Sequence, residues 1–152
     1  MMKISKTLAT LGLTAVNIAV LSACAPTVNL DAAPKANDPS CAEVSVRLPD
    51  VIDTHQKRVT NAQATAAWGE PTAVIVRCGL EPVTVSTLSC VSAGDVDWLV
   101  DDSQSPSFRF ITFGRSPATE VIVDSTAIAG VTAIEAVADA VQNIEATKTC
   151  SE

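Results

Sequence analysis

The chain of 152 residues contains five cysteines, and four of them constrain its fold more than any other feature. These four are Cys41, Cys78, Cys90 and Cys150. No two cysteines form a C-x-x-C pair, so a zinc ribbon or a thioredoxin-like redox site is not expected. In a compartment that allows disulfides, four such cysteines indicate two structural bridges. Three pairings are possible, and the two considered first are Cys41–Cys78 with Cys90–Cys150 and Cys78–Cys90 with Cys41–Cys150. The loop lengths differ too little in closure entropy to decide between them.

The fifth cysteine, Cys24, ends a segment that is typical of exported proteins. Residues 1–6 carry two lysines and no acid, and residues 7–21 are mainly apolar. These 15 residues are fewer than the roughly 17–25 that a membrane-spanning helix needs. A basic start, a short apolar stretch and small residues at the end predict a signal peptide at residues 1–23.

The four residues "LSAC", which end at Cys24, resemble the lipobox of bacterial lipoproteins. In that class the cysteine thiolate receives a diacylglyceryl group, and the signal peptide is cut just before it. The resemblance implies a protein anchored by lipid at the extracytoplasmic face of the cell membrane. The plainer interpretation is an ordinary signal peptide cut nearby, with Cys24 incidental.

The segment after Cys24 reads "APTVNLDAAPKANDPS" and contains three prolines. It has too little apolar surface to offset the entropy of ordering the chain. We therefore expect residues 24–40 to form a disordered tether, followed by a single globular domain at residues 41–152.

The chain is acidic, with a formal net charge of −7. Loss of residues 1–23 removes Lys3 and Lys6 and leaves −9. Such a charge repels phosphate backbones and anionic lipids, so we expect no nucleic-acid partner. Any attachment to a membrane must then be covalent or hydrophobic.

Hydrophobic periodicity predicts a helix, a series of strands and a final helix. Ser40 and Glu43 have capping-box spacing at the start of a helix that ends near residue 48, and residues 50–65 are predicted as a polar surface loop. Apolar or alternating stretches predict strands at 73–78, 82–91, 95–102, 107–113 and 118–123. Thr132 and Glu135 have the same capping-box spacing before an apolar stripe that runs to Ile144. We expect a two-layer α+β fold, in which both helices cover one face of a mainly antiparallel sheet of about four or five strands.

Three fragments of the chain resemble the DUF3515 family, which comprises uncharacterised exported proteins and lipoproteins of actinobacteria. The fragments are "AAWGEPTAVIVRCG", "GDVDWLVDD" and "FRFITFGRSPATEVIV". The resemblance covers residues 41–146 and implies an actinobacterial cell envelope, but no enzymatic activity. The recurring cysteines of the family look like Cys41 and Cys78, which favours their pairing and leaves Cys90 to pair with Cys150.

Few residues in the chain suggest a catalytic or metal-binding role. His55, the only histidine, lies in a polar stretch without a local partner that would make it a general base. The acidic run at 95–102 places Trp98 and Val100 where a calcium loop needs oxygen ligands. No nucleophile elbow, P-loop or dinucleotide fingerprint occurs. We therefore expect no enzyme, no cofactor and no metal.

Trp98 and Arg115 are the candidate ligand contacts, because tryptophan and arginine often mark recognition surfaces. The favoured interpretation is nevertheless that Trp68 and Trp98 lie in the core, because large aromatic side chains supply much of the area that a small core buries. In that case Arg115 pairs with a carboxylate such as Glu120 or Asp97.

Three functions remain open at this point. The leading hypothesis is a non-enzymatic binding or interaction module that is anchored in the membrane and has an envelope protein as its partner. The second is a carrier of a small ligand or cell-wall fragment, with Trp98 and Arg115 lining its pocket. The third is an envelope hydrolase that uses His55. The sequence does not define an oligomeric state.

Overall fold

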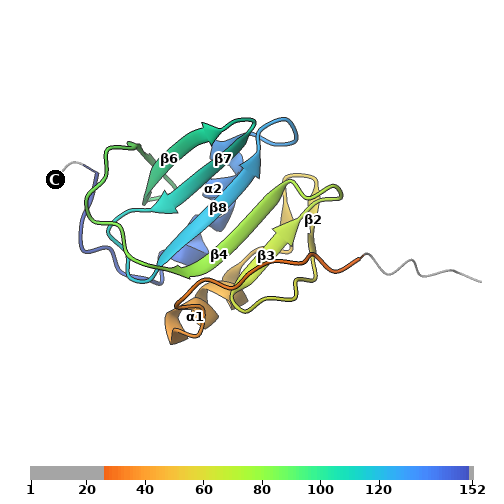
Figure 1. The fold of residues 1–152 in the computed structure, drawn as a ribbon, viewed down its shortest axis with the longest axis horizontal. Coiled ribbons are helices and arrows are strands. Elements are labelled where there is room, and N and C mark those ends of the chain that lie inside the picture. Colours follow the sequence, from red (N-terminus) through yellow and green to blue (C-terminus); the bar gives the residue numbers. More distant parts are fainter. Residues whose placement is uncertain (1–25, 151–152) are drawn as a thin grey trace, which may run out of the picture.

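The computed structural model describes residues 26–150, which form one antiparallel sheet and two helices (Figure 1). Cys24 and the predicted signal peptide lie outside the described residues. The elements are α1 (Pro39–Arg47), β1 (Val51–Ile52), β2 (His55–Arg58), β3 (Thr65–Trp68), β4 (Val74–Leu80), β5 (Ser89–Ala93), β6 (Val96–Gln104), β7 (Ser107–Thr112), β8 (Ala118–Asp124) and α2 (Gly130–Val141). The strand order in the sheet is β1-β2-β3-β4-β8-β7-β6-β5.

The structure confirms the α+β class, but the predicted number of strands was wrong. The sheet has eight strands, and three of them, β1 to β3, lie in the stretch expected to be a surface loop and turn. β2 has the sequence HQKR, which carries no alternating apolar pattern. It forms because its backbone pairs with β3, with Lys57 opposite Trp68 and Arg58 opposite Ala67. Backbone pairing of this kind leaves no periodic signal in the side chains.

Both helices pack against one face of the sheet and enclose the main core. Val74, Val76 and Cys78 of β4 alternate toward this face and belong to one buried cluster with side chains of α1 and α2. Trp68 and Trp98 are fully buried in the same cluster. Each indole Nε1 donates a hydrogen bond to a backbone carbonyl, Trp68 to Pro49 at 3.0 Å and Trp98 to Ala93 at 3.2 Å.

The opposite face carries a smaller apolar cluster. Leu99, Ile111, Phe113 and Ala118 form it, and Cys90 packs against it. Irregular segments rather than helices cover this face. The C-terminal segment joins it through backbone hydrogen bonds such as Thr147 N to Gly114 O at 2.8 Å.

The N-terminal segment corrects the expectation of a disordered tether in its described part. The Val28 backbone bridges to Thr60, and Lys35 N donates to Gly79 O at 2.8 Å. Ala33 and Ala36 are buried. In Figure 1 this segment runs along the sheet to α1. Backbone pairing and two small side chains attach it, so its low apolar content did not predict its order.

Gly79 shows how closely this segment approaches β4. Its φ is +109°, and an added Cβ would lie 2.4 Å from Ala36 N. A side chain there would therefore collide with the backbone of the N-terminal segment. The glycine of the "RCG" fragment thus allows the segment to dock.

Both predicted helix caps differ in the structure. Asp38, rather than Ser40, is the N-cap of α1, and its carboxylate accepts a hydrogen bond from Ser40 N at 2.9 Å. α2 begins at Gly130, two residues before Thr132, and its N-cap residue Ala129 makes no side-chain capping bond. Capping-box spacing alone did not locate either helix start, because other residues adopt the extended cap conformation.

Disulfides join Cys41 to Cys78 and Cys90 to Cys150, with Cα–Cα distances of 5.5 and 5.9 Å. These are the pairs that the family resemblance favoured. The first links α1 to β4, and the second links β5 to the C-terminal segment. Neither helix within residues 26–150 has the length and hydrophobicity of a membrane-spanning segment.

Candidate binding site at the His55–Arg58 strand

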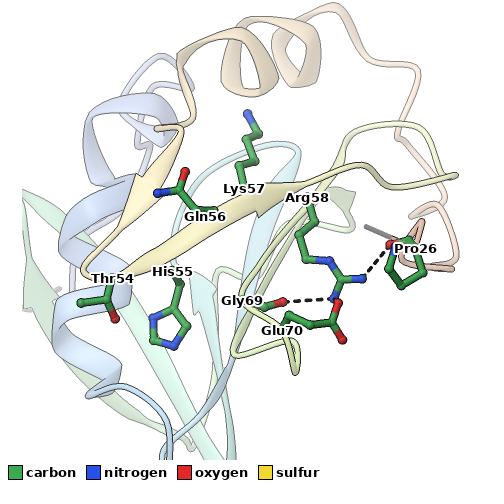
Figure 2. Close-up of a pocket in the computed structure, with 8 residues that line it drawn as sticks. All are labelled: Pro26, Thr54, His55, Gln56, Lys57, Arg58, Gly69 and Glu70. Carbon is green, nitrogen blue, oxygen red and sulfur yellow. Dashed lines mark hydrogen bonds and ion pairs between the residues drawn. The ribbon is translucent and has the colours of Figure 1, made fainter. Parts of the chain in front are cut away.

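A cavity of about 610 Å³ lies beside β2 (Figure 2). It is lined by Pro26, Thr54, His55, Gln56, Lys57, Arg58, Gly69 and Glu70. Three separate parts of the chain thus meet here: the N-terminal segment, β2 and the turn after β3. The cavity is open to solvent on one side and lies at the β1–β3 end of the sheet.

Arg58 organises the site. Its side chain is only 10% exposed, and Nη1 donates to the Gly69 carbonyl at 3.1 Å. Nη2 donates to the Pro26 carbonyl at 2.6 Å, so the same guanidinium fixes the N-terminal segment. Nε is buried and has no hydrogen-bond partner among the described residues. A rigid planar donor of this kind is suited to binding carboxylate or phosphate oxygens.

Glu70 is the counter-ion of Arg58. Its carboxylate lies 2.7 Å from Nη1, yet its side chain is 64% exposed. An exposed carboxylate is held weakly, because water screens the ion pair and the long side chain loses entropy when fixed. An anionic group of a ligand can therefore displace Glu70 and take its place against Arg58.

His55 forms another wall, and Gly69 makes room for its ring. Gly69 has a φ of +92°, and an added Cβ would lie 2.8 Å from His55 Cδ2. His55 Nδ1 is buried and forms no hydrogen bond with any described residue. In Figure 2 the His55 ring lies on the same side of β2 as Arg58 and Glu70. The ring adds an apolar face to the wall of the cavity, and its Nδ1 keeps an unused capacity for a hydrogen bond.

Lys57 points away from this wall of the cavity, as Figure 2 shows. Its ammonium lies 5.8 Å from the centroid of the Trp68 ring and donates to the Leu48 carbonyl at 3.4 Å. The aliphatic stem of such a lysine covers apolar surface while its charge stays near solvent. Lys57 therefore covers Trp68 rather than serving the site.

The predicted ligand contacts are not brought together in a pocket. Trp98 is fully buried in the core beneath the helices, as the favoured interpretation of the tryptophans expected. Arg115 is 7% exposed and donates to the Ile144 carbonyl, which fastens the C-terminal segment. Burial lowers the pKa of Arg115, and the charge of Asp97 opposes this shift. A cavity of about 290 Å³ beside Arg115 is lined by Asp97 and Lys148 but not by Trp98.

Glu120, the other carboxylate considered for Arg115, pairs elsewhere. Its two oxygens bind Arg77 and Arg109. The acidic run serves the fold too: Asp97 accepts from Cys150 N at 2.8 Å, and Asp101 accepts from Ser103 N at 3.1 Å. Within residues 26–150, no three His, Cys, Asp or Glu side chains lie where they could hold a metal ion.

Sequence reasoning missed Arg58, Gly69 and Glu70 as site residues. The "HQKR" and "WGEP" stretches were noticed, but as a loop and a turn. Their meeting depends on the β2–β3 pairing, which places position 58 opposite Ala67, close to the turn. The unusual concentration of basic residues in an acidic chain was the available signal.

The fold and site define a small, disulfide-linked α+β domain with a semi-open pocket at one end of its sheet. Comparison with family models identifies a match over residues 6–149 to DUF3515, described as a protein of unknown function. The chain belongs to this family, which confirms the resemblance seen in its sequence. No curated protein and no solved structure matches the chain.

Proposed function

We propose that this protein is a lipid-anchored, extracytoplasmic binding module of the cell envelope and that it acts without catalysis. The observation that carries the proposal is the hydrogen bond from Arg58 to the Pro26 carbonyl. It fixes the N-terminal segment at the rim of the cavity, only two residues after Cys24. Two residues of extended chain span at most about 7 Å, so the site would lie close to a lipid-bearing cysteine.

Two further features support an extracytoplasmic place. The "LSAC" sequence fits lipoprotein processing, and two disulfides fit an oxidising compartment. The acidic surface would not hold the chain on anionic lipids, so the lipid itself would supply the anchor. One acyl chain binds a membrane only marginally, whereas two or three chains hold it stably.

The chemistry of the site favours an anionic ligand with an apolar body. Arg58 offers a buried guanidinium whose counter-ion Glu70 is displaceable, and His55 offers a nitrogen without a partner. Carboxylate and phosphate are the groups that arginine binds best. Cell-wall fragments and the headgroups of lipids both carry such groups. For the carrier hypothesis, we therefore propose this cavity as the ligand site in place of Trp98 and Arg115.

Intact-protein mass spectrometry of the product extracted from native membranes tests the anchor. The expected mass is that of residues 24–152 plus a diacylglyceryl group and any further acyl chain. The Cys24→Ala variant is expected to be lost from the membrane fraction. An unmodified thiol at Cys24 would contradict the proposed lipid anchor, whereas ligand binding at the cavity is tested by a separate experiment.

Binding at the cavity is tested separately, by tryptophan emission during titration with a short-chain phosphatidic acid and a soluble cell-wall peptide. Trp68 directly precedes Gly69, which lines the cavity, so occupancy is expected to shift its emission through the backbone. Arg58→Gln should abolish the shift, and Glu70→Gln should strengthen binding because it removes the competing carboxylate. Arg47→Gln is the matched control, since Arg47 lies exposed on α1. A shift that survives in Arg58→Gln would contradict a role for the cavity.

A further inference from the structure

β5 is an outer strand of the sheet and pairs only with β6. No backbone hydrogen bond joins β5 to any other described segment. One edge of β5 therefore presents main-chain donors and acceptors that a further strand can use. Natural sheets protect such edges with lysine or proline, and the sequence SCVSA contains neither.

An apolar cleft of about 360 Å³ lies directly beside this edge, between the sheet and α2. Phe108 and Phe110 of β7 and Ile134 of α2 are among its lining residues. Val91 of β5 and Val131 of α2 also line it and are 40% and 53% exposed. An open edge beside an apolar cleft is the arrangement with which sheets bind extended peptides, where the edge pairs with the backbone and the cleft takes a side chain.

The charges around the cleft have one sign. α2 contains no lysine or arginine and carries exposed Glu135 and Asp139, and β5 carries no charge. Asp97 and Asp101 of β6 lie on the opposite face, toward Cys150 and Arg109. Asp95 lies exposed in the turn between β5 and β6. Glu135 of α2 lies against that turn, since its Cα is 3.8 Å from the place of a Cβ on Gly94. This surface attracts a cationic partner and repels an acidic one.

We propose that the β5 edge and the adjoining cleft bind an extended segment of a partner protein as a ninth strand. This segment is rich in β-branched apolar residues and in basic residues. The partner's backbone pairs with β5, one apolar side chain enters the cleft between Val91 and Val131, and its basic side chains meet Asp95 and Glu135. This proposal names the partner class for the binding role proposed above and rests on that role. It does not depend on a lipid at Cys24 or on the cavity at Arg58.

The test uses the full chain and a synthetic peptide of alternating valine and lysine, followed by hydrogen exchange. The peptide is expected to slow amide exchange in β5 and to change the emission of Trp98, which lies opposite Val91 across the β5–β6 pair. Val91→Lys and Val131→Lys should each weaken binding by about tenfold, because they remove an apolar contact and add a repelling charge. Val46→Lys is the control, since Val46 is 77% exposed on α1.

Two comparison peptides make the result decisive. A peptide with glutamate in place of lysine is expected to bind at least tenfold more weakly, and one with a central proline should not protect β5. Equal binding of the glutamate peptide, or protection confined to residues outside β5, would overturn the proposal. So would a self-association through β5 that excludes the peptide. If Cys24 proves unmodified while β5 still binds the peptide, the anchor fails and this inference stands.

Discussion

Glu120 of β8 and Arg77 of β4 face each other across the centre of the sheet, on the side away from the helices. The carboxylate is fully buried, and Arg77 Nε donates to it at 2.6 Å. Arg109 of β7 binds the second carboxylate oxygen. The arginines are 31% and 38% exposed, so their outer ends reach water while they shield the carboxylate.

Replacing Glu120 with glutamine should destabilise the fold by about 2–4 kcal/mol, because it leaves two neighbouring guanidinium groups without their counter-charge. The arginines' access to water keeps the loss below that of a fully buried pair. Chemical denaturation at pH 7 measures the change. Glu43→Gln, which breaks the exposed pair with Arg47, should cost under about 0.5 kcal/mol. Equal losses in the two variants would contradict this account.

Gly79→Ala should loosen the N-terminal segment. The new methyl would collide with the backbone at Lys35 and Ala36, and the φ of +109° is strained for alanine. We expect a loss of about 1–3 kcal/mol in unfolding free energy. Hydrogen exchange should become faster at residues 33–36 and stay unchanged in α2. Unchanged exchange at residues 33–36 would mean that the segment is not held as described.

Mild reduction should open Cys90–Cys150 before Cys41–Cys78. Cys41 and Cys78 are buried in the core, whereas Cys90 and Cys150 are partly exposed, and a thiolate must reach the sulfur it attacks. Differential alkylation with peptide mapping at increasing reductant gives the order. In the chain-entropy model, loss of either bridge removes about 4 kcal/mol. Simultaneous opening of both would point to unfolding before reduction.

Asp38→Ala should weaken the fold at neutral pH and have little effect in strong acid. Hydrogen bonds from the Ser40 side chain and backbone lower the pKa of Asp38 below its ordinary value of 3.8. A carboxyl whose pKa is lower in the folded state stabilises it above the unfolded pKa, and this contribution is lost as pH falls through the folded pKa. Urea unfolding at pH 7 and below pH 3 measures the difference between wild type and variant. A difference that persists unchanged in acid would contradict the capping role.

Side-chain patterns predicted those parts of the fold that are stabilised by local burial. Val74 to Cys78 and the alternation of Val96, Trp98 and Val100 marked strands correctly, because one or both faces of those strands are apolar. The stripe through Ile134 and Val137 marked α2 for the same reason. The family resemblance added the pairing of Cys41 with Cys78.

The remaining elements depend on distant backbone contacts, which leave no periodic trace. His55 to Arg58 are polar, and their strand exists only because β3 lies beside them. Lys35 is held by the Gly79 carbonyl, 44 positions further along the chain. The candidate site could not be predicted for the same reason, because Pro26, Arg58 and Glu70 meet only after these pairings form. Trp98 was a candidate for a surface by residue type, and its burial followed from its place beneath the helices.

The two disulfides lie on opposite faces of the sheet, since Cys41–Cys78 belongs to the helical core and Cys90 packs on the cluster beyond it. Each disulfide therefore attaches a different covering segment to the sheet: Cys41–Cys78 attaches α1, and Cys90–Cys150 attaches the C-terminal segment. In a reducing environment the protein would lack both disulfides at once. Formation of the complete native fold therefore depends on the redox state of the surroundings, and a copy without its disulfides is expected to lose order first at its two ends.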